Sequence, residues 1–180
     1  MKHVILALVL LGLTTGAVFA AAKKQTAKAE LWNAKGEKVA TATLKEAKGG
    51  VAISLQATGL PEGIHAFHIH AVGKCDAPDF KTAGGHFNPE NKKHGLKNPE
   101  GPHAGDMPNI TVDKKGVGKA KVVNTRVSLG EGANSLFHEG GTALVIHEKA
   151  DDDMTDPAGN AGNRIACGLI QKGRWGHSSI

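Results

Sequence analysis

Aromatic side chains are scarce in this chain of 180 residues, which has no tyrosine, two tryptophans and five phenylalanines. Proteins that bind nucleic acid combine a clustered basic stripe with aromatic platforms for the bases. Here the lysines are scattered along the chain instead of massed in one block. The composition therefore argues against nucleic acid as a partner, and the mild excess of positive charge is better suited to small anions.

No apolar run is long enough to cross a membrane, which takes about 20 residues in a helix. The longest run, Val4–Leu13, follows Lys2 and is followed by Val18-Phe19-Ala20, a pattern typical of a cleaved secretory signal. We therefore expect residues 1–20 to be removed, with an uncleaved membrane anchor as the alternative. Residues 21–27 are expected to be a mobile leader and 28–180 a single domain.

Removal of residues 1–20 takes away one lysine and no acid, which leaves 21 basic and 17 acidic residues and a net charge of +4. The mature protein is expected to be periplasmic or otherwise exported, without membrane contact. Only two cysteines are present, Cys75 and Cys167. An even number in an oxidising compartment predicts a disulfide, and two free buried thiols are the alternative.

Helix signals are also lacking, since no segment of ten or more residues has a convincing amphipathic helical pattern. Apolar and polar residues instead alternate in short runs, separated by glycine-containing turns, which is typical of antiparallel strands. The runs are 29–34, 38–44, 51–57, 60–70, 109–123, 142–148 and 164–171. This pattern predicts an all-β sandwich or flattened barrel. Two long loops, 73–108 and 148–163, interrupt it, and loops of that length usually carry function.

Histidine, in contrast, is concentrated next to these loops. The sequence HAFHIH holds His65, His68 and His70, and a later strand holds His147. In a strand, residues i and i+2 face the same side about 6.6–6.8 Å apart, so His68 and His70 can converge on one ion. These two rings with His147 and one loop histidine would form an all-imidazole set, which suits tetragonal Cu(II).

The first loop carries further ligands of a different composition. His86, His94, His103 and Asp106 occur in the stretches GGHFNP, KKHG and GPHAGD. His103 and Asp106 are three residues apart and can bind one ion with a single turn of backbone between them. Three imidazoles and one carboxylate suit tetrahedral zinc. A loop this polar cannot be ordered by burial alone, so a structural metal is expected to hold it.

These motifs together resemble the copper/zinc superoxide dismutases of the exported bacterial type. The matching stretches are GIHAFHIHAVGKC, AGGHFNP, KKHG, GPHAGDMPN, ALVIHEKADD and DPAGNAGNRIACGLI, which run from about residue 63 to 170. The resemblance implies an eight-stranded antiparallel Greek-key sandwich or flattened barrel with two functional loops. The N-terminal runs fit the same plan.

The resemblance also assigns roles to residues. It implies that copper is bound by His68, His70, His86 and His147, and zinc by His86, His94, His103 and Asp106. His86 would then be shared, because an imidazole loses its second proton only when both of its nitrogens bind cations. Asp151 matches a carboxylate that links a copper histidine to a zinc histidine, and Arg164 matches the arginine that receives the anionic substrate. Cys75 and Cys167 match an intrachain disulfide.

The remaining histidines are expected to have other roles. His65 matches a framework histidine that bonds the backbone, whereas His138 and His177 match no ligand and are expected in solvent. The second loop is shorter than in eukaryotic relatives and has only Lys149 as a base. Lys74, Lys81, Lys92 and Lys93 on the first loop are therefore the candidates for steering the substrate.

The implied function is the dismutation of superoxide to oxygen and hydrogen peroxide in a copper redox cycle, with His86 as proton carrier. The alternative is a non-catalytic periplasmic protein that binds or stores copper and zinc. Loss of a copper ligand or of the arginine would favour that alternative, and none is lost. A homodimer is compatible with the resemblance, but branches of the family use different surfaces for dimers, so no interface is predicted.

Overall fold

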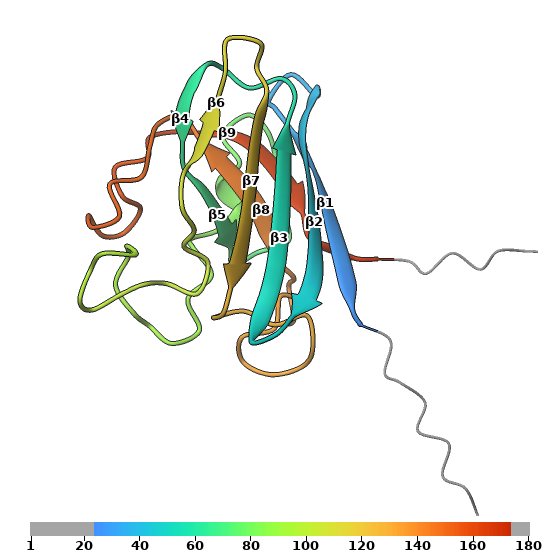
Figure 1. Cartoon of the computed structure of the whole chain (residues 1–180), viewed down its shortest axis with the longest axis vertical. Helices are drawn as coiled ribbons and strands as arrows, with labels where there is room; N and C mark the ends of the chain where they lie inside the picture. Colours follow the sequence, from blue (N-terminus) through green and yellow to red (C-terminus); the bar gives the residue numbers. More distant parts are fainter. Residues whose placement is uncertain (1–23, 174–180) are drawn as a thin grey trace, which may run out of the picture.

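The alternating runs of the sequence do form strands in the computed structural model, which describes residues 24–173 (Figure 1). In this part of the chain the strands are β1 (Thr26–Trp32), β2 (Lys38–Ala47), β3 (Gly50–Ala57), β4 (Gly63–His65), β5 (Phe67–His70), β6 (Ile110–Val112), β7 (Gly118–Asn124), β8 (Ala143–His147), β9 (Arg164–Leu169) and β10 (Gln171–Lys172). The only helix described is a single 3₁₀ turn at Lys81–Ala83. The expected all-β class is confirmed.

All strand pairs are antiparallel, and their order is β4-β6-β7-β3-β2-β1-β9-β8-β5, with β10 added beside β1. The two ends of this order, β4 and β5, are consecutive in sequence and separated only by Ala66. One extended run therefore pairs with β6 through its first half and with β8 through its second half. This run closes the sheet into a nearly complete barrel. Counted as one strand, with β10 as an extension, it gives the eight strands expected.

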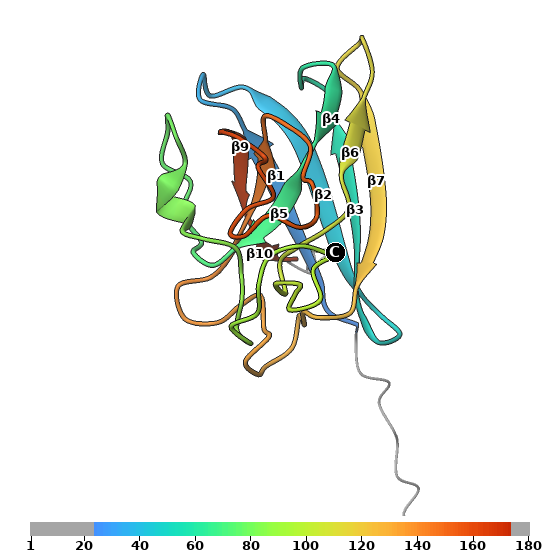
Figure 2. The same cartoon turned by 90° about the vertical axis from the view of Figure 1, so that its left-hand side faces the viewer.

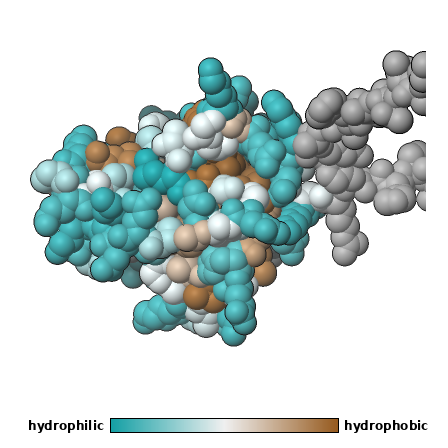
Figure 3. All heavy atoms as spheres, turned by 90° about the horizontal axis from the view of Figure 1, so that it is seen from below, coloured by the Kyte–Doolittle hydropathy of each residue, from teal (hydrophilic) through white to brown (hydrophobic). Residues whose placement is uncertain are grey.

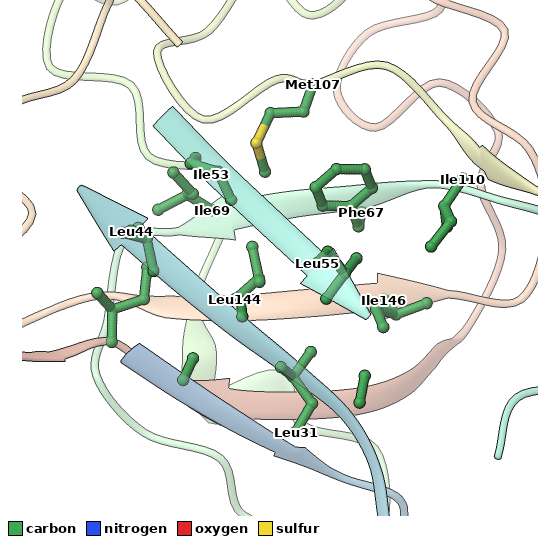
Figure 4. Packing of buried hydrophobic residues seen from close by; sticks show 14 of the residues in the cluster. Leu31, Leu44, Ile53, Leu55, Phe67, Ile69, Met107, Ile110, Leu144 and Ile146 are labelled. Carbon is green, nitrogen blue, oxygen red and sulfur yellow. The ribbon is translucent and has the colours of Figure 1, made fainter. Parts of the chain in front are cut away.

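The barrel interior is filled by the apolar residues of each alternating run. Figure 4 shows Leu31, Leu44, Ile53, Leu55, Phe67, Ile69, Met107, Ile110, Leu144 and Ile146 pointing into one cluster, and each is at most 1% exposed. Burial of such side chains stabilises a fold by about 1.5–3 kcal/mol each. Because side chains alternate in a strand, the inward position of Ile69 places its neighbours His68 and His70 on the outer face of β5.

The second predicted loop and the later part of the first lie together on the left in Figure 1, whereas the start of the first loop, with the 3₁₀ turn, lies behind the strands in that view. Together the loops cover the outer face of β5 and β8. A second, smaller apolar cluster under the first loop contains Phe80, Ala83, Ala143, Val145 and Cys167. The predicted disulfide is present and joins Cys75 to Cys167 across 92 positions of sequence. It therefore ties the first loop to β9.

A third long connection, residues 125–142 between β7 and β8, was not singled out from the sequence. It lies at the lower end of the barrel in Figures 1 and 2. Val127, Leu129 and Leu136 anchor it in the main core, each at most 2% exposed. Its path is irregular because only an isolated bridge between Ser128 and Ser135 provides strand-like pairing. Seen from below, the surface is mostly hydrophilic with separate hydrophobic spots (Figure 3).

At the N-terminal end, β1 begins at Thr26, two residues before the expected start of the domain. Thr26 and Ala27 pair with β2, and Ala27 also pairs with Lys172 of β10. The predicted signal peptide, the start of the leader and His177 lie outside the described residues. Within residues 24–173, no helix has the length and apolar character needed to span a membrane.

Candidate metal centre

Four histidines meet on the outer face of the barrel, beneath the two loops. His68 and His70 project from β5 and His147 from the end of β8, while the first loop brings His86 to an isolated bridge with His70. The Nε2 atoms of His70 and His147 are 3.4 Å apart, and the rings of His68 and His86 have centroids 4.0 Å apart. This all-histidine cluster (His68, His70, His86 and His147) contains the four residues expected to bind copper.

A second group shares His86 with the first. Oδ1 of Asp106 lies 2.9 Å from Nδ1 of His86, 3.1 Å from Nδ1 of His94 and 3.4 Å from Nδ1 of His103. The other carboxylate oxygen, Oδ2, accepts hydrogen bonds from the main-chain N–H groups of Gly95 and His103, at 2.9 Å each. This aspartate cluster (His86, His94, His103 and Asp106) contains the four residues expected to bind zinc.

The donor atoms of both clusters fit a bound cation. In each cluster the ligand atoms lie within 4.8 Å of one another. Nδ1 of His68 and Nε2 of His86 are buried and have no hydrogen-bond partner among the described residues. An orphaned buried nitrogen costs free energy, so a native structure needs a reason to keep it. Coordination of a metal would satisfy both atoms.

The protonation of the all-histidine cluster is also suited to a metal. Burial disfavours the charged imidazolium and lowers the pKa of both His86 and His147 to about 4. Burial also lowers the pKa of His68 and holds that of His70 well below its usual value. The rings are therefore neutral near pH 7, which is the state that coordinates metals.

His94 behaves in the opposite way when no metal is bound. Burial works against its charge, but contacts with the carboxylates of Asp106 and Asp151 outweigh burial and raise its pKa to about 9. Burial likewise disfavours the charge of Asp106, yet the surrounding histidines hold the pKa of that carboxyl far below its usual range. Without a metal, His94 therefore holds a proton between the carboxylates of Asp106 and Asp151 near pH 7, and a cation that binds there must displace that proton.

Asp151 joins the two clusters by binding one histidine of each. Nε2 of His68 donates to Oδ2 of Asp151 at 2.7 Å, and Nε2 of His94 donates to Oδ1 at 3.0 Å. The carboxylate thus fixes which nitrogen of each ring is left for a metal: Nδ1 of both His68 and His94. The resemblance implied that Asp151 links a histidine of one metal set to a histidine of the other, and these two hydrogen bonds join His68 to His94 in that way.

A β-bulge brings Arg164 to the same site. The register between β8 and β9 shifts after Ile146, so that His147 pairs with Arg164 instead of Ile165. The guanidinium is half-buried and donates to the carbonyl oxygens of Phe80 at 2.7 Å and Gly84 at 2.6 Å. With His70, His86 and His147 of the all-histidine cluster it lines a hollow of about 390 Å³.

The other residues singled out from the sequence are two further histidines, His65 and His138, and the candidate steering lysines. Both ring nitrogens of His65 face main-chain carbonyls, of His147 at 2.9 Å and Pro61 at 3.0 Å, as expected of a framework histidine. His138 is not simply solvated, because its ring stacks on Phe87 with centroids 5.3 Å apart. Among the candidate steering lysines, which are all exposed, Lys81 pairs with Asp79 at 3.0 Å.

Two supporting residues were missed in the sequence. The side-chain amide of Asn109 pairs with the main chain of Asp151, donating to its carbonyl at 2.9 Å and accepting its N–H at 2.8 Å. Gly159 lies against Asp151 and His94 so closely that a Cβ there would collide with both, and its φ of +62° also favours glycine. Neither residue carries a local signal, because the Asn109–Asp151 contacts span 42 positions and Gly159 meets His94 across two different loops.

Comparisons with known proteins agree with this geometry. The profile of a family described as copper/zinc superoxide dismutase (SODC) matches residues 38–170. Cu-Zn superoxide dismutase 1 of Aquifex aeolicus (strain VF5) is 57% identical over 155 residues, which cover 85% of this chain and 92% of that protein. Cu-Zn superoxide dismutase 2 of the same organism is 60% identical over 147 residues, covering 81% and 86%.

Solved structures show the same fold. The crystal structure of a SOD-like protein from Bacillus subtilis superposes with a TM-score of 0.76 at 41% sequence identity. The match covers 79% of this chain and 96% of that chain.

Proposed function

The chain belongs to the copper/zinc superoxide dismutase family, and on that premise we propose how its two clusters divide the chemistry. The protein dismutates superoxide to oxygen and hydrogen peroxide with copper and zinc as its metals. The all-histidine cluster is the copper half-site and the aspartate cluster the zinc half-site. The observation that carries this assignment is the place of His86 in both clusters.

The ring contacts indicate which atoms would serve as ligands. His68 would use Nδ1, since its Nε2 is bound to Asp151, and His70 would use Nε2, since its Nδ1 donates to Gly84 O at 2.9 Å. His86 would offer Nδ1 to zinc, beside Asp106, and its unpartnered Nε2 to copper. An imidazole that bridges two cations is held in place from both sides.

Bound copper would supply one-electron redox chemistry to superoxide, and zinc a permanent positive charge on the far side of His86. The residues of the chain supply the proton and orient the ligands. Nε2 of His86 can hold a proton and deliver it to the product, because Nδ1 stays anchored at the aspartate cluster. Asp151 orients His68 and His94 by accepting from both rings.

Arg164 would hold the substrate anion in the hollow it shares with His70, His86 and His147. A guanidinium is charged at every accessible pH and presents several donors in one plane. Two of its N–H groups are used on Phe80 and Gly84, which fixes the plane and leaves further donors for the anion. A small oxyanion held there would be next to the copper half-site.

We also propose that the protein is exported to the periplasm after loss of residues 1–20. The Cys75–Cys167 disulfide supports this location, since such bonds persist in oxidising compartments. Sequencing the N-terminus of protein recovered from the periplasmic fraction would test the proposal. A chain that keeps residues 1–20 and stays with the membrane would contradict it.

The assignment is tested by measuring metal content and superoxide decay on one purified sample. One copper and one zinc per chain, with a tetragonal copper spectrum and rapid dismutation, are expected. A single metal at full occupancy with no second site on titration would overturn the shared role of His86. A protein that binds both metals but does not dismutate superoxide would be a binding or storage protein.

A further inference from the structure

The turn His103–Asp106 contributes two of the four residues of the aspartate cluster, and each of its carbonyl oxygens is bound from outside the turn. Ala104 O accepts from Nδ2 of Asn124 at 2.8 Å, and Gly105 O accepts from the N–H of Ile69 at 3.0 Å. The other two carbonyls, of His103 and Asp106, both accept from Arg126. The turn is therefore fixed through its main chain, independently of the ligand side chains.

Arg126 supplies two of these contacts from one planar group. Its Nε donates to His103 O at 3.2 Å and its Nη2 to Asp106 O at 2.6 Å. The side chain is half-buried, and its own main-chain N–H donates to Oδ1 of Asn124 at 2.9 Å. Asn124, the last residue of β7, is 1% exposed and bonds the turn through its other side-chain atom. Asn124 therefore connects β7 directly to the turn, and Arg126 reaches the turn from the connection that follows β7, where its main chain is bound to Asn124.

We propose that Arg126 is a positioning residue of the zinc half-site, an inference that rests on the assignment of His103 and Asp106 as zinc ligands. The guanidinium spans the two carbonyls and so sets the spacing of the two ligand residues before zinc arrives. A planar fork with fixed N–H directions can do this, whereas a lysine ammonium makes a point contact. Zinc then binds a prepared site and does not have to order a polar loop by itself.

The charge of Arg126 allows positioning to be separated from electrostatics. A cation near the half-site repels a second cation, so loss of the charge alone would tighten zinc binding. Loss of the two carbonyl contacts would weaken it, because the free turn must be ordered when zinc binds. The two effects have opposite signs. A neutral replacement therefore reports which one dominates.

The experiment compares Arg126→Gln and Arg126→Lys with the wild type, and uses Lys121→Gln as control because Lys121 is an exposed cation on β7. Zinc affinity and zinc release are measured by chelator competition on folded protein, and the geometry of the half-site by the visible spectrum of Co²⁺ placed there. Arg126→Gln is expected to release zinc about tenfold faster or more, a loss typical of contacts that orient ligands. Its Co²⁺ spectrum should change, Arg126→Lys should be intermediate, and Lys121→Gln should match the wild type.

Unchanged or tighter zinc binding in Arg126→Gln would overturn the proposal. A lower melting temperature of the metal-free protein, with no change in zinc binding, would also overturn the proposal. A residue that only stabilises the fold leaves zinc binding by the folded state unchanged. If Arg126→Gln does not fold, the test rests on Arg126→Lys. A zinc release rate and a Co²⁺ spectrum of Arg126→Lys equal to those of the wild type would overturn the proposal. A His103→Ala variant that keeps wild-type zinc affinity would instead overturn the ligand assignment, and so the proposed function.

Discussion

Arg164 and His70 donate hydrogen bonds to the same main-chain oxygen, that of Gly84, at 2.6 and 2.9 Å. One carbonyl on the first loop therefore sets both the position of the Arg164 guanidinium, the proposed substrate-binding group, and the ring orientation of a proposed copper ligand. A carbonyl that accepts two bonds is fully used, so neither donor can move without disturbing the other. The anion site and the copper half-site are in this way built as one unit.

Arg164→Ala should lower the rate constant for superoxide dismutation by about tenfold or more, a loss of at least about 1.4 kcal/mol in the barrier. The reason is the loss of the cation that attracts and orients the anion beside the copper half-site. Arg164→Lys should recover part of the rate, because charge is kept but the planar fork is lost. Pulse radiolysis at several ionic strengths would measure both the rate and its salt dependence.

The salt dependence provides the control for this prediction. Attraction between exposed charges is screened over about 8 Å at physiological ionic strength, so the rate of Arg164→Ala should respond less to salt than that of the wild type. Metal content should stay the same in all three proteins, since arginine is not a ligand. A variant with the wild-type rate and salt response would show that Arg164 is an ordinary surface charge.

Asp79→Asn should have the opposite effect on the rate. Asp79 lies in a hollow with Lys81 and Arg164, and its negative charge opposes the positive potential that attracts superoxide. Its removal should raise the dismutation rate constant at low ionic strength, by about twofold, and the gain should fade as salt is added. Asp113→Asn, in the turn between β6 and β7, removes the same charge elsewhere and should leave the rate unchanged.

Asp151→Asn should weaken zinc binding by about 10–100-fold, the range usual for carboxylates that orient metal-bound histidines. An asparagine can accept from only one of the two rings, so either His68 or His94 loses its partner. Chelator competition on the folded variant would measure the loss, with the exposed Asp76→Asn as control. Zinc affinity equal to that of the wild type would mean that Asp151 does not orient the zinc ligands.

Zinc binding to the metal-free protein should release a proton from His94 at neutral pH. Without zinc the pKa of His94 is about 9, so the ring is mostly protonated below pH 9 and mostly neutral above it. Zinc binds the neutral ring, and its apparent affinity should therefore rise with pH until about pH 9 and then level off. Calorimetry in buffers of different ionisation enthalpy would count the protons. A release that does not decline above pH 9 would contradict the assignment to His94.

Cys75→Ser should lower stability without removing any metal ligand. The Cys75–Cys167 bond closes a loop of 92 positions, and the chain-entropy argument gives about 4.5 kcal/mol as an upper estimate. A loss of about 3 kcal/mol would lower the melting temperature by about 6–12 °C in a domain of this size. Denaturation under oxidising and reducing conditions would check this, because reduction should affect the wild type and leave the variant unchanged.

The sequence by itself determined the class of fold and predicted two groups of metal-binding residues. Period-two alternation requires an inner and an outer face, so the outward position of His68 and His70 followed once Ile69 was taken as core. Histidines and an aspartate on a loop too polar to be buried without a partner predicted a metal, because only a cation satisfies so many ligand groups at once. Local pattern and ligand chemistry were sufficient for these conclusions, whereas the place of His86 in both groups was implied only by the family resemblance.

Only the tertiary structure decided how the parts are oriented. The closure of the barrel through β4 and β5, and the bulge that turns Arg164 toward His147, depend on pairings between distant strands. The third loop, 125–142, was missed because its buried anchors have no regular period. Asn109 and Arg126 were missed for a related reason. They bind main-chain atoms of residues far along the chain. Because every residue carries these main-chain groups, the residue types in a sequence do not predict such a contact.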